Sequence, residues 1–146
     1  MKNNYYDIAI NEKQYYEASS KASMFNNFNA IACQQISEKL LKHIAYETCS
    51  DISVLKTHKL RNIYMAVKQY ITLPSDVINF LSTLSEFYFD ARYPGDDYIS
   101  VSDEDAKFAE ETMLAVYDAV TEWVNKQSES KEDSSLLDKA IAAMNK

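Results

Sequence analysis

The sequence is poor in the residues that make tight turns, with one glycine and two prolines among 146 residues. Glycine supplies the positive φ of many turns and proline presets turn geometry, so this scarcity excludes architectures that need many tight turns. It also excludes glycine-rich phosphate loops, because those loops need several glycines for close approach of the backbone. The sequence therefore predicts an all-α fold.

Cysteine and long apolar runs are scarce as well. Cys33 and Cys49 are too few for a disulfide framework or a zinc site, and buried free thiols are expected. No segment approaches the roughly 20 apolar residues that span a bilayer, and the stretch Met1–Tyr5 lacks the apolar core of a secretion signal. These absences predict a cytoplasmic protein without a membrane segment.

Composition and net charge limit the classes of protein and of binding partner that remain. Hydrophobic residues make up 47% and charged residues 25% of the chain, as in ordinary globular domains. The net charge of −7 argues against a general affinity for nucleic acid, although a local basic patch could still bind one. Basic residues dominate between Lys39 and Lys68, and acidic residues dominate between Glu86 and Glu111. Such a distribution suits self-association or a charge-matched partner, and it equally suits a solvated face with a capped helix start.

Apolar residues recur at threes and fours along five segments, which predicts an up-and-down bundle of four to five helices. The expected helices span about 5–25, 28–47, 58–71, 75–93 and 103–126, with a break at 26–27 and a loop at 48–57. Ser102, followed by acidic residues, resembles a helix cap. The expected bundle is 1–127, followed by a Ser- and charge-rich linker at 128–135 and a short amphipathic helix at 136–146, either docked or fraying.

Two polar residues fall inside the apolar arc of the second expected helix. At about 100° per residue, Gln35 and Lys39 lie between Ile31 and Ile36. One interpretation is a helix at an interface, with Lys39 extending outward along its methylenes. The other is a polar site that faces a cleft, because polar groups in an apolar arc need partners.

The stretch from Phe87 to Tyr98 combines an arginine, acids and tyrosines around the only glycine. The Arg92 guanidinium suits a phosphate or carboxylate and can stack on tyrosine. Arg92 could instead pair internally with Glu38, Asp90 or Asp96 and hold the loop. Asp96 and the aspartate after it could bind a divalent cation, or they could be simple turn residues, and we expect no metal.

The histidines show no catalytic pattern. His43 and His58 have no nucleophile or metal ligand at a telling spacing, and a cap or a loop anchor is the default role for His58. Hydrolase motifs are missing, and no cofactor motif is present. The regular amphipathic pattern of the expected helices is also what a binding or assembly protein would show.

Four short segments follow one another along the chain: QQISEKLLK at 34–42, THKL at 57–60, YFDARYPG at 88–95 and DAK at 105–107. In this order they resemble the HEPN (higher eukaryotes and prokaryotes nucleotide-binding) domain family, and the similarity covers about residues 6–127. The resemblance implies a helical bundle, usually dimeric, with polar residues of the second helix and of the Arg-Tyr-Pro segment near a cleft. It also implies nucleotide binding, a nucleotidyltransferase partner in a toxin–antitoxin pair, or RNA cleavage.

The ribonucleases of that family resemble one another through an arginine followed four to six residues later by a histidine, and neither Arg92 nor Arg61 has one. We therefore expect a binding module without catalytic residues. Metal-independent ribonuclease activity and a helical dimerisation domain without ligand remain the alternatives. Arg92 and Lys39 are the expected anion contacts and Tyr88 and Tyr93 the stacking groups; the other expected ligand-binding residues are Gln35, Glu38, His58 and Asp96.

Overall fold

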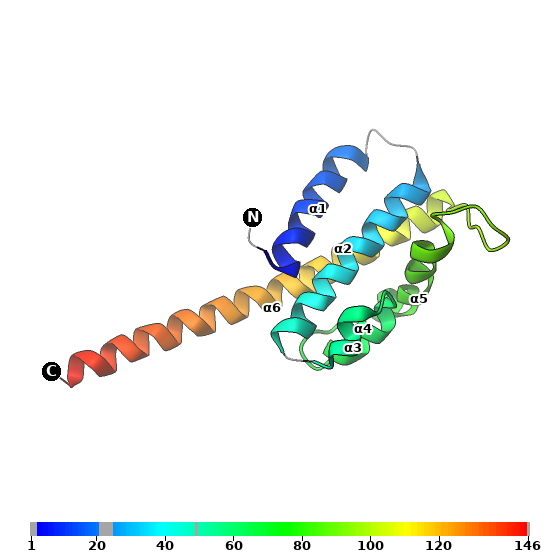
Figure 1. Ribbon diagram of the computed structural model, residues 1–146. Coiled ribbons are helices and arrows are strands. Elements are labelled where there is room, and N and C mark those ends of the chain that lie inside the picture. Colours follow the sequence, from blue (N-terminus) through cyan, green and yellow to red (C-terminus); the bar gives the residue numbers. More distant parts are fainter. Residues whose placement is uncertain (1–2, 21–24, 49, 146) are drawn as a thin grey trace.

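The structure is a computed structural model that describes residues 3–20, 25–48 and 50–145. These residues form six helices and no strand, so the prediction of an all-α fold is confirmed. The helices are α1 (Tyr5–Ser20), α2 (Asn26–Glu47), α3 (Ile52–Lys56), α4 (Leu60–Val67), α5 (Ser75–Asp90) and α6 (Asp103–Met144). The first five helices and the start of α6 form a bundle, and the rest of α6 extends far beyond it (Figure 1).

Helix α2 lies at the centre of the bundle and contacts all five other helices. From Cys33 to Ala45 the helix is buried on almost every side, including polar positions such as Gln34, Glu38 and Lys42. The predicted apolar arc on this helix begins at Phe28, and there it runs onto the surface, since Phe28 is 57% exposed. A helix that is surrounded by neighbours has no solvent face, so its sequence need not show a simple amphipathic period.

The start of α6 agrees with the sequence pattern. The Ser102 hydroxyl accepts a hydrogen bond of 3.1 Å from the backbone N–H of Asp105, which satisfies one of the free donors at the helix start. Asp103, Glu104 and Asp105 place negative charge in the first turn, where the helix dipole favours it. The predicted cap at Ser102 is present.

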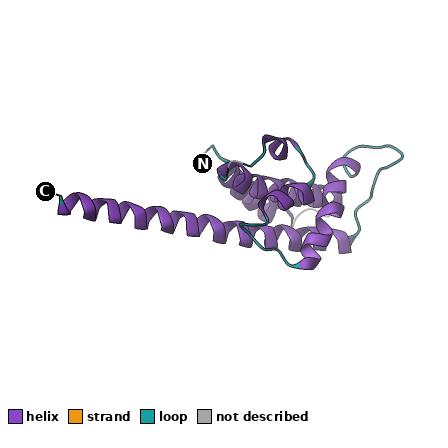
Figure 2. Cartoon of the chain, turned by 90° about the horizontal axis from the view of Figure 1, so that it is seen from below, coloured by secondary structure: helices purple, strands orange, loops and turns teal. Residues whose placement is uncertain are grey.

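The end of α6 differs from the prediction. Residues 128–135 were expected to be a linker and 136–146 a separate helix, but one helix runs without interruption from Asp103 to Met144 (Figure 2). This helix contains no glycine or proline, and serine, glutamate and lysine all tolerate helical geometry. Residues 125–145 are all exposed, so this part of the helix packs against no other described part of the chain. Without a packing partner, residues 128–135 need no apolar face, which is why their sequence shows no apolar period.

Several other boundaries shift. The short helix α3 lies within the expected loop, and it begins after Asp51, whose carboxylate accepts a 2.9 Å hydrogen bond from the Ser53 N–H. Asn26 and Asn27 belong to the first turn of α2 instead of breaking the chain. Helix α4 is shorter than expected, and α5 ends at Asp90, before the Arg-Tyr-Pro segment. The end of the first expected helix falls on residues 21–24, outside the described residues.

The cysteine prediction is confirmed where it can be checked. Cys33 is a buried free thiol, and burial raises its pKa to about 12, so the reactive thiolate is scarce at neutral pH. Cys49 lies outside the described residues. None of the described helices combines the length and the apolar character needed to cross a membrane.

Candidate functional site

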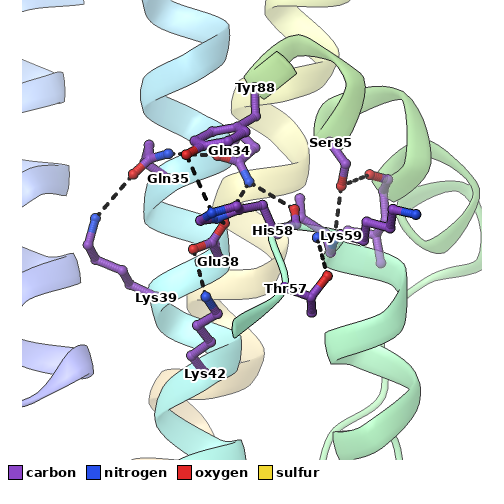
Figure 3. A network of polar contacts seen from close by, with 12 residues as sticks. Gln34, Gln35, Glu38, Lys39, Lys42, Thr57, His58, Lys59, Ser85 and Tyr88 are labelled. Atoms are coloured by element: carbon purple, nitrogen blue, oxygen red, sulfur yellow. Dashed lines mark hydrogen bonds and ion pairs between the residues drawn. The ribbon is translucent and has the colours of Figure 1, made fainter. Parts of the chain in front are cut away.

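A buried polar network surrounds Glu38 in the middle of α2. Glu38 as a whole residue is only 6% exposed, and Lys42 is 5% exposed. One carboxylate oxygen of Glu38 pairs with the Lys42 ammonium at 2.9 Å, and the other accepts a 3.0 Å hydrogen bond from the Gln34 amide (Figure 3). Residues four apart lie above one another on a helix, so α2 alone aligns these three side chains.

The same carboxylate also holds a histidine from outside the helix. The Nδ1 atom of His58 lies 2.9 Å from Glu38 Oε1, and the Gln34 amide donates to the His58 carbonyl at 3.3 Å. Burial alone would raise the pKa of Glu38, but the hydrogen bonds from Lys42, Gln34 and His58 outweigh it. The pKa of Glu38 is therefore lowered, and the buried carboxylate is ionised at neutral pH.

His58 is positioned by the connection between α3 and α4. The Thr57 hydroxyl accepts a hydrogen bond from the Lys59 N–H at 3.1 Å, and the Ser85 hydroxyl of α5 accepts one from the Leu60 N–H at 2.9 Å. The first bond closes a turn around His58, and the second attaches the chain just after it to α5; His58 itself belongs to neither α3 nor α4. Its ring stacks on Tyr88 with a centroid distance of 4.4 Å, and its side chain remains 40% exposed.

The arginine predicted from the sequence lies on the same aromatic surface. The Arg92 guanidinium carbon is 4.7 Å from the centre of the Tyr88 ring and 5.4 Å from the centre of the Tyr93 ring. None of the ion pairs within the described residues involves Arg92, so the expected alternative of pairing with Glu38, Asp90 or Asp96 is not found. Arg92 is exposed on its loop, so its guanidinium donors are accessible to a ligand.

One asparagine ties this loop to the bundle. The side-chain amide of Asn27, in the first turn of α2, donates to the backbone carbonyls of Ala91 at 3.1 Å and Ile99 at 2.8 Å. Its oxygen accepts a 2.7 Å hydrogen bond from the Val101 N–H. Both ends of the loop that carries Arg92 are therefore attached to one side chain of α2.

Lys39 and Gln35 lie on a different side of α2, toward α1. The Lys39 ammonium pairs with Glu12 of α1 at 2.8 Å and donates to the Gln35 amide oxygen at 3.4 Å. Gln35 in turn donates to Gln34 at 3.1 Å, so these residues join the Glu38 network. The interpretation of a helix at an interface describes Lys39 better than a free anion contact, because its charge already has a partner.

The structure thus joins seven of the eight expected ligand-binding residues into one chain of contacts. They are Gln35, Glu38, Lys39, His58, Tyr88, Arg92 and Tyr93. Asp96 is exposed on the loop beyond Arg92 and shows no contact with the others. Within the described residues no three His, Cys, Asp or Glu side chains are grouped as a metal site would require.

Sequence reasoning missed several residues of this arrangement, Gln34, Lys42 and Asn27 among them. Gln34 and Lys42 could have been found from their spacing of four on either side of Glu38, which stacks all three on one face. Asn27 was assigned to a break between helices, and no local pattern distinguishes that role from a clamp on a distant loop.

One of three comparisons with known proteins gave a match. The family model described as HEPN domain matches residues 5–126, which is most of the chain. A comparison with curated proteins and one with solved structures each gave no match. The match begins with the first turn of α1 and ends within α6, so it contains the whole polar network and the Arg92 loop. The chain belongs to the HEPN domain family.

Proposed function

We propose that this protein is a HEPN-type module that binds a nucleotide at the surface formed by His58, Tyr88, Arg92 and Tyr93. The observation that carries the proposal is the Arg92 guanidinium, which is held near two tyrosine rings without a carboxylate partner in the described part of the chain. A guanidinium held in this way offers a planar set of donors to a phosphate.

The neighbouring rings supply the second half of nucleotide recognition. Tyr93 is 67% exposed, and the stacked pair of His58 and Tyr88 lies beside the guanidinium. Bases stack on such rings with little dependence on sequence, at about 1–3 kcal/mol per base. A phosphate on Arg92 and a base on an exposed ring would use both kinds of group at once, whereas an inorganic anion would use the arginine alone.

Titration of AMP by calorimetry tests this proposal. Arg92→Ala is expected to weaken binding by roughly 10- to 100-fold, because a hydrogen bond to a charged group contributes about 1.5–3 kcal/mol. Arg61→Ala is the matched control, since Arg61 is the other arginine in the chain and is exposed on α4. Equal affinity of Arg92→Ala and wild type, or no binding by wild type to AMP or to a short single-stranded RNA, would reject the site.

A second function, metal-independent RNA cleavage, is favoured by one observation. Glu38 holds Nδ1 of His58, which leaves Nε2 as the acceptor, 3.5 Å from the Tyr88 hydroxyl. In this role Nε2 would take the proton of a ribose 2′-hydroxyl, whose oxygen attacks the adjacent phosphorus while the 5′-oxygen leaves and takes a proton from water. Arg92 would stabilise the negative charge that develops on the phosphate oxygens.

Incubation of single-stranded RNA with the protein in EDTA separates the two functions. Cleavage by wild type that is lost in both His58→Gln and Arg92→Ala would establish the enzyme. Binding of RNA without cleavage supports the binding module. Arg61→Ala again serves as the control, and it also reports any contaminating nuclease, whose activity would persist in every variant.

The proposal extends to a partner and a location through the family. A nucleotidyltransferase encoded beside this protein, in a toxin–antitoxin pair in the cytoplasm, would bring nucleotides to the Arg92 surface. Co-expression with such a neighbour followed by affinity purification tests this extension, and Arg92→Ala asks whether the contact uses the same surface.

A further inference from the structure

A second pocket lies at the end of the bundle away from Arg92. The start of α1, the end of α2 and the middle of α6 line it, and its volume is about 520 Å³. Small-molecule sites have volumes of roughly 300–1,000 Å³, so a ligand of modest size would fit. Asn27 holds the Arg92 loop at the start of α2, whereas His43 lies in the pocket about 24 Å farther along the same helix. The two sites are therefore separate.

Four aromatic rings form a connected wall of this pocket. The ring of His43 lies 5.6 Å from that of Tyr6 and 6.3 Å from that of Trp123, measured between centroids. The Tyr70 ring follows, 6.5 Å from Trp123. Neighbouring rings meet at angles of 49°, 77° and 67°. Such steep angles are typical of the aromatic cages that hold organic cations, whereas a flat base would stack on a single ring face.

The charges that line the pocket also favour a cation. The carboxylates of Asp7 and Glu47 belong to the lining, and both act electrostatically on His43. Glu47 forms no ion pair within the described residues, and Asp7 Oδ2 accepts a 3.2 Å hydrogen bond from the Asn4 amide. Lys131 is the cation of the described lining, and it lies on the exposed part of α6. The lining therefore carries more negative than positive charge.

His43 adds an unused polar group to the pocket. The residue is 8% exposed, and its buried Nδ1 atom has no hydrogen-bond partner in the described part of the chain. Burial lowers the pKa of His43 and outweighs the two carboxylates, so the ring is neutral at neutral pH and one of its nitrogens is an acceptor. Buried polar groups normally have a partner, so an unpartnered histidine in a pocket indicates a missing donor.

We propose that this pocket binds a small alkylammonium ligand, with its charged nitrogen against the aromatic wall and near Asp7 and Glu47. The positive charge would face the rings and the carboxylates, an N–H group would serve as donor to His43, and the alkyl part would contact Val124. A metal ion is a poor match, because no three His, Cys, Asp or Glu side chains of the described residues are grouped as metal ligands. An anion would be repelled by the carboxylates.

The fluorescence of Trp123 provides a direct assay, because it is the only tryptophan in the chain. The full-length protein is titrated with butylammonium chloride, which replaces sodium chloride so that ionic strength stays constant. Butanol and sodium butyrate are the matched neutral and anionic probes of similar size. We expect a saturable change with butylammonium and an affinity at least about 10-fold weaker for the other two, since charged hydrogen bonds and cation–π contacts need the ammonium.

Two sets of variants assign the binding to this pocket. Asp7→Asn/Glu47→Gln should weaken butylammonium binding at least about 10-fold, whereas Glu86→Gln/Glu111→Gln, which removes two exposed acids elsewhere, should bind like wild type. Tyr70 is 38% exposed, so its replacement is expected to leave the fold intact, which circular dichroism verifies. Tyr70→Ala should weaken binding about 3- to 30-fold, and Tyr70→Phe, which keeps the ring, should restore it.

Several results would overturn the proposal. Equal responses to butylammonium, butanol and butyrate would mean that the pocket does not recognise positive charge. Unchanged affinity in Asp7→Asn/Glu47→Gln, or the same loss in both double variants, would mean that the ammonium is not held by these two carboxylates. Tyr70→Phe as weak as Tyr70→Ala would exclude the ring as the contact. Wild-type protein without a saturable response to butylammonium would refute the site altogether.

Discussion

Replacement of Lys42 by methionine isolates the contribution of the buried ion pair in α2. Methionine is unbranched like lysine and fits the same apolar surroundings, so the main loss is the ammonium that lies 2.9 Å from Glu38. Both side chains of the pair are less than a tenth exposed, at 6% and 8%, so water cannot replace the missing charge. Glu38 would then keep only Gln34 and the partly exposed His58 as partners.

Removal of one partner from a buried pair typically costs about 3–5 kcal/mol. We expect about 3 kcal/mol for Lys42→Met, because two hydrogen bonds to Glu38 remain. For a chain of this size the loss corresponds to a fall in Tm of roughly 6–12 °C. The double variant Glu38→Gln/Lys42→Met carries no buried charge, and it is expected to lose only about 1 kcal/mol relative to wild type.

Urea denaturation followed by circular dichroism at several pH values provides the assay. The pKa of Glu38 is lowered by its partners, so the stability from its ionised form is fully present above the ordinary value of 4.5 and is lost as the pH falls through the lower folded value. The difference between wild type and Lys42→Met should therefore shrink below about pH 4.5.

Two results would contradict this reasoning. A cost below about 1 kcal/mol for Lys42→Met at pH 7 would place the pair among surface ion pairs, whose contribution is about 0–1 kcal/mol. A double variant no more stable than Lys42→Met would show that the uncompensated charge of Glu38 is not the source of the loss.

Two further predictions concern the loop clamp and the buried histidine. Asn27→Ala removes three hydrogen bonds to loop backbone and should cost about 1–3 kcal/mol, with faster amide exchange at Val101 than in Asn29→Ala as the control. Burial lowers the pKa of His43 below its ordinary 6.5, so its contribution to stability is present above pH 6.5 and is lost as the pH falls through the lower folded value. His43→Gln should therefore flatten the fall in Tm between pH 7.5 and 5.5; an unchanged slope would mean that another group titrates.

Local features of the chain were enough to determine where most helices lie. The scarcity of glycine and proline predicts helices throughout, and Ser102 with the acidic residues after it marks the start of α6 because cap and dipole act within one turn. The order of short segments around Gln35, His58 and Arg92 was also sufficient for the family, which the match to residues 5–126 shows.

Tertiary structure decided what those segments do. Glu38 and His58 are 20 residues apart, and only the packing of α2 against α4 and α5 makes them partners. The absence of a histidine after Arg92 is a fact of the sequence, yet the fold brings His58 to the same tyrosine from a different segment. Contacts of this kind depend on several helices at once, and no local pattern contains them.

The end of α6 separates the two levels most clearly. Its residues have good intrinsic helix propensity, which can be read from the sequence. Residues 128–135 show no apolar period, and for that reason a linker was predicted there. Periodicity measures packing against a neighbour, whereas propensity measures the backbone. The sequence by itself determined a helical chain of the HEPN family with a polar second helix; the tertiary structure decided which polar groups meet, and that α6 leaves the bundle as a single helix with an uncovered tip.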